Sequence, residues 1–335
     1  MSPKNSRQQF ASKPLEGGAR APVSADSVHT QLGLRAGQSL ELLKALHILT
    51  AEGKINQDSR RKLKQVNHLT QFLETHLREI AAQKMRDVQG LQMKDAQGTD
   101  ARKNTLSITD LGAGKSYLGF MLYDLLIKDI WDQEAGALQA HIYGVETRPE
   151  LVQASRLLAQ TLNFKSMTFL NMSALESQIN DELPDHIDVV TALHACDSAT
   201  DDAISFALRK GATFIALVPC CQAEMAGSLK KSKALALART PLAELWRHPL
   251  HTREFGSQIT NVLRCLYLES QGYSLTVTEL VGWEHSMKNE LILARFTGQR
   301  KKGAAERLAT LVEEFGLMSV AKLRFSKVFE SLKGV

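Results

Sequence analysis

Long apolar runs are absent from this 335-residue sequence, and none of its apolar stretches approaches the length of a membrane span. Residues 1–27 are polar, rich in Ser, Pro and Gly, and lack the apolar core of a signal peptide, so we expect a disordered arm there. Cysteine is also scarce, and Cys196, Cys220, Cys221 and Cys265 do not have the spacing of a disulfide framework or a zinc ribbon. The sequence therefore predicts a cytoplasmic protein without membrane contact or a bound metal.

Acidic residues are under-represented in one part of the chain only. Residues 1–103 contain 17 Lys and Arg against 10 Asp and Glu, whereas residues 104–335 contain 24 against 26. This excess fits either a solvated helical surface or a surface that attracts an anionic polymer such as RNA. Charge alone does not choose between the two.

Helical periodicity follows the polar arm. Apolar residues in 39–55 have helical spacing, and those in 56–85 form one stripe that leaves Arg60, Arg61, Lys62 and Lys64 on the remaining surface. A polar linker covers 95–104. We expect four regions: the arm at 1–27, basic helices at 28–98, a catalytic domain at 99–298 and C-terminal helices at 299–335.

From Thr105 onward, predicted strands alternate with predicted helices. The strands are expected within 105–114, 140–147, 166–174, 186–196, 211–221, 273–281 and 290–296, and the last two are joined by so short a segment that they should be antiparallel. This order predicts an α/β fold with a doubly wound, mostly parallel, seven-stranded sheet. Ligands bind such sheets beyond the carboxyl ends of the strands.

A glycine turn follows the first predicted strand in the sequence Asp110-Leu-Gly-Ala-Gly-Lys115. A dinucleotide-binding G-x-G-x-x-G spacing fails here, and GKS lacks the earlier glycine of a P-loop. The next predicted strand ends at Glu146, whose carboxylate suits the hydroxyls of a ribose. S-adenosylmethionine (SAM) has a ribose and an amino-acid part but no phosphate, so it fits this combination.

Five segments together resemble a known family: DLGAGKSYLG, GVET, TALHACDSATDDAI, VPCCQ and HSMKNELILARF. They are similar to the class I SAM-dependent methyltransferases, with a Rossmann-like sheet. The resemblance is narrower to the branch of the METTL25-like proteins and the glutathione-S-transferase C-terminal-domain-containing methyltransferases. It covers roughly residues 60–297. It implies a methyltransferase with SAM as its cofactor.

The resemblance also implies a set of cofactor-binding residues. Asp110, Gly112 and Gly114 would hold the methionyl part, with Lys115 beside them, and Glu146 would hold the ribose. Met172 and Ser173, which follow the third predicted strand, would border the adenine. Lys115 is equally well explained as a solvated residue at a helix start.

Candidate reactive residues follow the fourth and fifth predicted strands. His194 is a candidate base, and Asp197 or Asp201 would orient the acceptor or cap the next helix, with capping favoured for Asp201. Cys220 and Cys221 end the next strand, with Gln222 beside them. Zinc binding by this His and Cys set and a cysteine nucleophile are two minority interpretations.

RNA is the favoured acceptor. Arg60, Arg61 and Lys64 are predicted to contact phosphates, and Gln222, Lys288 and Asn289 are predicted to face the acceptor. A protein or small-molecule methyltransferase, in which the basic helices only pack, stays open. A SAM-binding adaptor without catalysis is the alternative from another class.

Overall fold

A computed structural model describes residues 29–30, 32–35, 37–92, 105–128, 138–193, 198–219, 223–232, 241–280 and 290–333. Residues 39–335 form one compact unit, which contains the two N-terminal helices as well as the sheet. The predicted bounds of the four regions stay a prediction. Within the described ranges, no helix has the length and apolar character needed to cross a membrane.

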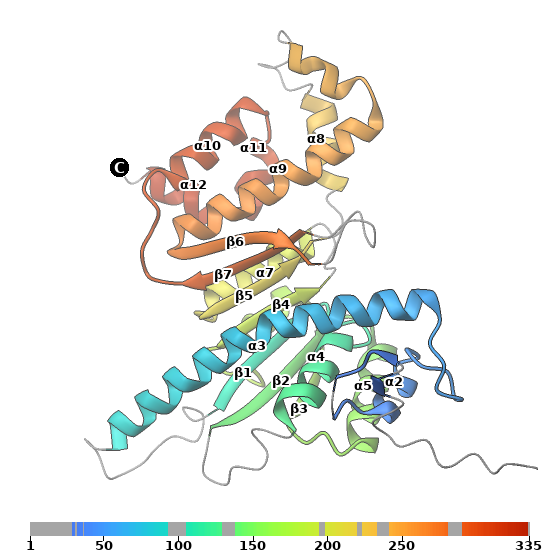
Figure 1. The fold of residues 1–335 in the computed structure, drawn as a ribbon. Coiled ribbons are helices and arrows are strands. Elements are labelled where there is room, and N and C mark those ends of the chain that lie inside the picture. Colours follow the sequence, from blue (N-terminus) through green and yellow to red (C-terminus); the bar gives the residue numbers. More distant parts are fainter. Residues whose placement is uncertain are drawn as a thin grey trace, which may run out of the picture. The chain divides into compact units, whose positions relative to one another are not determined.

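The sheet has seven strands in the order β3-β2-β1-β4-β5-β7-β6, and only β7 is antiparallel to its two neighbours (Figure 1). This confirms the predicted doubly wound, mostly parallel α/β fold, including the antiparallel pair at one edge. The strands are β1 (Thr105–Leu111), β2 (Gln139–Glu146), β3 (Met167–Asn171), β4 (Val189–Leu193), β5 (Phe214–Val218), β6 (Tyr273–Glu279) and β7 (Glu290–Phe296).

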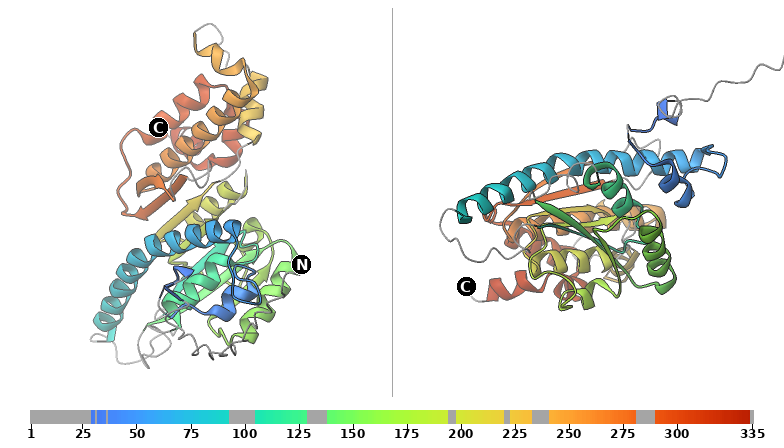
Figure 2. Two further views of the ribbon diagram at one scale, coloured as in Figure 1. Left: turned by 45° about the vertical axis from the view of Figure 1, so that its right-hand side comes forward. Right: turned by 90° about the horizontal axis from the view of Figure 1, so that it is seen from below.

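Helices connect the strands and cover both faces of the sheet. They are α2 (Leu40–Ala45), α3 (Gln57–Gln92), α4 (Tyr117–Leu122), which continues as the π-helical η2 (Tyr123–Ile127), α5 (Pro149–Thr161), α6 (Ala174–Ser177), α7 (Ser198–Arg209), α8 (Ala223–Ser232), η4 (Pro241–Trp246), α9 (Pro249–Ser270), α10 (Ala304–Glu314), α11 (Met318–Arg324) and α12 (Ser326–Lys333). Helices α3 and α7 lie on opposite faces (Figure 2).

Helix α3 runs antiparallel to β1 along one face of the sheet. Near its start, the Ser59 hydroxyl donates to the His47 carbonyl at 3.4 Å. Near its other end, the Lys84 ammonium donates to the carbonyl of Thr105, the first residue of β1, at 2.8 Å. The same ammonium lies 2.8 Å from the buried Asp188 carboxylate, just before β4. The start of α3 is therefore at the carboxyl edge of the parallel strands.

The first predicted helix is shorter than expected. Helix α2 ends at Ala45, and His47 adopts a left-handed backbone with φ of 56°. The Leu46 carbonyl instead accepts a hydrogen bond from the Tyr117 hydroxyl at 3.1 Å. Apolar burial continues past the helix end at Ile48 and Leu49, which explains why the sequence pattern looked helical over a longer range.

Candidate cofactor and acceptor site

The turn after β1 is built on two glycines with positive φ. Gly112 has φ of 68° and Gly114 has φ of 58°, values that residues with a Cβ rarely adopt. The Ala113 amide donates to the Val145 carbonyl at 3.0 Å, and the Gly114 amide donates to Glu146 Oε2 at 2.8 Å. The glycine turn and the end of β2 are thus joined directly, as expected for residues that share one ligand.

Glu146 is an ionised acid with several donors around it. Burial alone would raise its pKa, but hydrogen bonds from the Arg148 side chain and amide and from the Gly114 amide outweigh burial and lower the pKa to about 2. Arg148 Nε lies 3.0 Å from Oε1 and its Nη2 lies 3.2 Å from Oε2. The Arg148 side chain is 59% exposed, so it can leave the carboxylate without breaking core packing.

Asp110 lies at the end of β1, opposite Thr191 of β4 and Gly144 of β2. Its side chain is buried and accepts a hydrogen bond from the Thr191 hydroxyl at 2.7 Å. Burial raises the pKa of Asp110 to about 7, the Thr191 hydrogen bond opposes that rise, and the negative charge of Glu146 adds to it. Two acids at one edge of the sheet therefore have widely separated pKa values.

The segment after β3 lies beside the end of β2. The Met172 amide donates to the Glu146 carbonyl at 3.2 Å, and the Asn171 side-chain amide donates to the same carbonyl at 3.0 Å. Ser173 caps α6, where its hydroxyl accepts from the Glu176 amide at 3.2 Å and donates to the Glu176 carboxylate at 2.7 Å. The Ser173 hydroxyl is therefore already used within a capping box.

Lys115 lines an apolar cavity of about 390 Å³ beside the glycine turn. Leu46 and His47 form one wall of this cavity, and α5 forms the other through residues that include Leu151 and Leu158. The segment between α2 and α3 therefore reaches the turn that carries the predicted cofactor residues.

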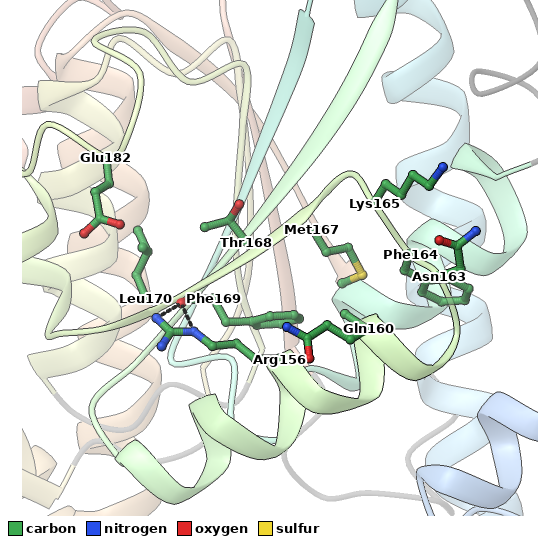
Figure 3. A pocket seen from close by; sticks show the side chains of 11 residues that line it. Arg156, Gln160, Asn163, Phe164, Lys165, Met167, Thr168, Phe169, Leu170 and Glu182 are labelled. Atoms are coloured by element: carbon green, nitrogen blue, oxygen red, sulfur yellow. Dashed lines mark hydrogen bonds between the residues drawn. The ribbon is translucent and has the colours of Figure 1, made fainter.

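A larger cavity, of about 480 Å³, lies elsewhere, along the edge strand β3 (Figure 3). Its walls are the second half of α5, residues 163–165 and β3, and none of its lining residues belongs to the glycine turn. The Arg156 guanidinium donates to the Phe169 carbonyl there, with Nε at 2.9 Å, and covers part of the sheet edge. This cavity is not the predicted cofactor site.

The predicted reactive residues lie outside the described ranges. These residues are His194, Asp197, Cys220, Cys221, Gln222, Lys288 and Asn289. The ends of β4 and β5, which precede two of these segments, are neighbours, with Leu193 opposite Val218. Among the described residues, no group of His, Cys, Asp and Glu side chains is arranged to hold a metal ion.

The predicted phosphate contacts lie at the start of α3. Arg60, Arg61, Lys62 and Lys64 are all exposed, and Arg61 lies 3.5 Å from Asp58 in a surface ion pair. The apolar stripe of the same helix, which includes Leu69, Leu73 and Leu77, is buried as predicted. The sequence analysis did not identify Arg148, Asn171 or Thr191. Only strand register brings Asn171 and Thr191 beside the two acids, and Arg148 reaches Glu146 by folding back over two residues.

A family profile described as a methyltransferase domain matches residues 61–228, half of the chain, and includes β1 to β5 and the glycine turn. The chain belongs to this methyltransferase family. The match confirms the predicted methyltransferase and, with it, SAM as the cofactor. The match does not test the predicted membership of the METTL25-like branch.

Solved structures of methyltransferases match part of this chain at low sequence identity. An rRNA methylase from Streptococcus thermophilus has 6% identity and a TM-score of 0.33, and the match covers 58% of this chain and 87% of that chain. The precorrin-6y C5,15-methyltransferase from Geobacter metallireducens has 17% identity and a TM-score of 0.33, with 58% and 81% covered. Fibrillarin from Aeropyrum pernix, in complex with SAM, has 14% identity and a TM-score of 0.31, with 56% and 65% covered. No curated protein matches the sequence significantly.

Proposed function

We propose that this methyltransferase transfers the methyl group of SAM to RNA. The observation that carries the proposal is the placement of the basic start of α3 at the same edge of the sheet as the glycine turn. The Ser59–His47 and Leu46–Tyr117 hydrogen bonds connect that helix start to the helix that follows the turn. Exposed guanidinium and ammonium groups near a reacting edge suit phosphate contacts, which position a substrate without reading its sequence.

The residues of the turn fit the cofactor. Gly112 and Gly114 leave room for the close approach of a methionyl group, and the ionised Glu146 is an acceptor for ribose hydroxyls. SAM supplies an electrophilic methyl group when it is bound. Arg148 is proposed to release Glu146 at that point, because Arg148 and the Gly114 amide already occupy both carboxylate oxygens.

The roles proposed on the acceptor side come from the sequence. His194 is proposed to take a proton from the acceptor, with Asp197 orienting it. Cys220, Cys221, Gln222, Lys288 and Asn289 are proposed to surround the acceptor. The similarity of the sequence motifs to the METTL25-like branch supports an assignment to that branch. We propose a cytoplasmic location because the four cysteines lack the spacing of a disulfide framework, which fits a reducing compartment.

Replacing Glu146 by alanine is expected to weaken SAM binding by about 1–3 kcal/mol, the range for losing hydrogen bonds to a charged acceptor. Calorimetry with SAM measures this directly. Glu150→Ala is the matched control, because Glu150 is an exposed acid in the first turn of α5 and lies outside the turn. Equal SAM affinity in the parent and Glu146→Ala would remove Glu146 from the site.

Reversing charges at the start of α3 tests the acceptor. The double variant Arg60→Glu, Arg61→Glu is expected to bind total cellular RNA more weakly at low salt. Its plot of log affinity against log salt should also be shallower, by about one unit or more, because fewer counterions are released. SAM affinity should not change, since neither residue belongs to the glycine turn.

The control for this experiment is Arg78→Glu, Arg86→Glu. These exposed residues lie on the same helix, closer to the end that contacts the start of β1. RNA affinity that falls equally in both double variants would indicate nonspecific attraction. Unchanged RNA binding and methyl transfer in Arg60→Glu, Arg61→Glu would favour a protein or small-molecule acceptor.

A further inference from the structure

A buried ion cluster lies on the face of the sheet covered by α7 and α9. Its centre is the Arg264 guanidinium of α9, which is fully buried. Arg264 Nε lies 2.7 Å from Asp201 Oδ1, and its Nη2 lies 3.2 Å from Oδ2 of the same carboxylate. We define the ion cluster as Asp201, Glu224, Asn261, Arg264, Glu290 and Arg324.

The cluster joins elements that are far apart in the sequence. Arg324, at the end of α11, donates to Asp201 in the first turn of α7 and to Glu224 in the first turn of α8. Arg264 Nη1 donates to the Asn261 side-chain oxygen at 3.1 Å, and Asn261 in turn donates to Glu290, the first residue of β7, at 2.7 Å. One network therefore holds the starts of α7, α8 and β7.

These three starts are all at the carboxyl edge of the parallel strands. Helix α7 follows the end of β4 and α8 follows the end of β5, and these strand ends are paired. Strand β7 begins at the same edge, because Ile292 is opposite Leu217 near the end of β5. Acceptors of an enzyme with this topology bind at that edge. The segments predicted to contact the acceptor directly precede these three starts in the sequence.

The Asp201–Arg264 and Arg324–Glu224 ion pairs of the cluster differ in solvent exposure. The Asp201 and Arg264 side chains are 4% and 0% exposed, so the loss of either one would leave an unpaired buried charge and destabilise the fold. The Glu224 side chain is 49% exposed, and an ion pair at that exposure contributes little to stability. The contact between Arg324 and Glu224 can therefore be removed without a large loss of stability. Its effect is to hold the first turn of α8 in place.

We infer that Arg324 is a positioning residue of the methyltransferase reaction, which fixes the starts of α7 and α8 through Asp201 and Glu224. Through this side chain, the C-terminal helix α11 helps to position the sheet edge at which the acceptor binds. The inference depends on methyl transfer at this edge of the sheet and is independent of whether the acceptor is RNA.

Alkylation of the full-length protein by iodoacetamide, with each site quantified by peptide mass spectrometry, tests the inference without an acceptor. Cys220 and Cys221 directly precede α8, and Cys196 directly precedes α7. Glu224→Gln is expected to raise the alkylation rates of Cys220 and Cys221 several-fold and to leave Cys196 unchanged. Arg324→Gln should raise all three rates, and Arg324→Lys should raise them less.

Two internal references accompany the measurement. Burial raises the pKa of Cys265 to about 12, so its alkylation should stay slow in every variant. Lys301→Gln removes a different ion pair of the C-terminal segment, that with Glu269, and is expected to leave all rates unchanged. SAM affinity should be the same in all of these proteins. The alkylation rates are measured without an acceptor, so a failure of the RNA proposal would not affect them.

Unchanged rates in Glu224→Gln and Arg324→Gln would overturn the inference. It would also be overturned if Lys301→Gln raised the rates equally, since that result indicates general loosening of the C-terminal helices. Should Arg324→Gln fail to fold, Glu224→Gln decides alone, because the loss of a half-exposed carboxylate leaves the buried pair intact.

Discussion

Replacing Asp201 by alanine should lower the free energy of unfolding by about 3–5 kcal/mol, the cost of breaking a buried ion pair by removing one partner. Arg264 is fully buried and would keep its charge without the Asp201 carboxylate, to which it donates through two nitrogens. Urea denaturation monitored by circular dichroism measures the change, provided that both proteins have the same dependence on urea concentration.

The double variant Asp201→Ala, Arg264→Met is the companion to this measurement. It removes both charges and fills part of the volume with an apolar side chain, so it should be more stable than Asp201→Ala alone. Lys301→Gln breaks an ion pair whose lysine is 58% exposed, and it should change stability by less than about 1 kcal/mol. A small effect of Asp201→Ala would show that the cluster contributes little to folding.

The second large effect concerns pH and Asp110. A carboxyl group whose pKa is higher in the folded protein binds its proton more tightly there, so its ionisation opposes folding. The pKa of Asp110 rises from 3.8 to about 7, chiefly through burial. Its contribution should therefore reduce the free energy of unfolding as pH increases from about 4 to about 7, and remain constant above that range.

Asp110→Asn isolates this contribution, because the amide keeps an oxygen for the Thr191 hydroxyl and does not ionise. At pH 4 the variant and the parent should have similar stability. At pH 8 the variant should be more stable by up to about 4 kcal/mol, at about 1.4 kcal/mol for each unit of pKa shift.

The shifts of three other titrating groups act in the opposite direction, and they cancel in this comparison because both proteins contain these groups. Burial lowers the pKa of His76 and His141, so these side chains favour folding as pH rises toward 6.5. Glu146, with its pKa lowered from 4.5 to about 2, completes its contribution below pH 5. A stability difference between parent and Asp110→Asn that does not vary with pH would contradict the assignment.

The central strands β4 and β5 were predictable from the sequence because they have nearly continuous apolar character. The run around Val189–Leu193 is buried on both faces, and the glycine turn marks the end of β1 without reference to any other element. The end of α2 was not predictable. His47 takes a left-handed conformation while distant partners, Ser59 and Tyr117, bind the carbonyls around it.

The candidate cofactor site was predictable only where a residue is marked by its position in the local sequence. Glu146 is the last residue of β2 and is recognisable in the sequence as an acid at a strand end. The contact of Arg148 with both carboxylate oxygens depends on how its side chain folds back over two residues. In the ion cluster, the sequence indicated a helix-capping role for Asp201. Its partners, Arg264 and Arg324, come from helices whose sequences carry no sign of the pairing.

The ion cluster also sets an order of events during synthesis. Asp201 precedes Arg264 by 63 residues and Arg324 by 123 residues along the chain. When β1 to β5 have emerged from the ribosome, Asp201 still lacks both of its arginine partners. Closing such long segments costs chain entropy before their contacts form. The nascent chain therefore passes through a stage in which the five parallel strands are present and the start of α7 still carries an uncompensated charge.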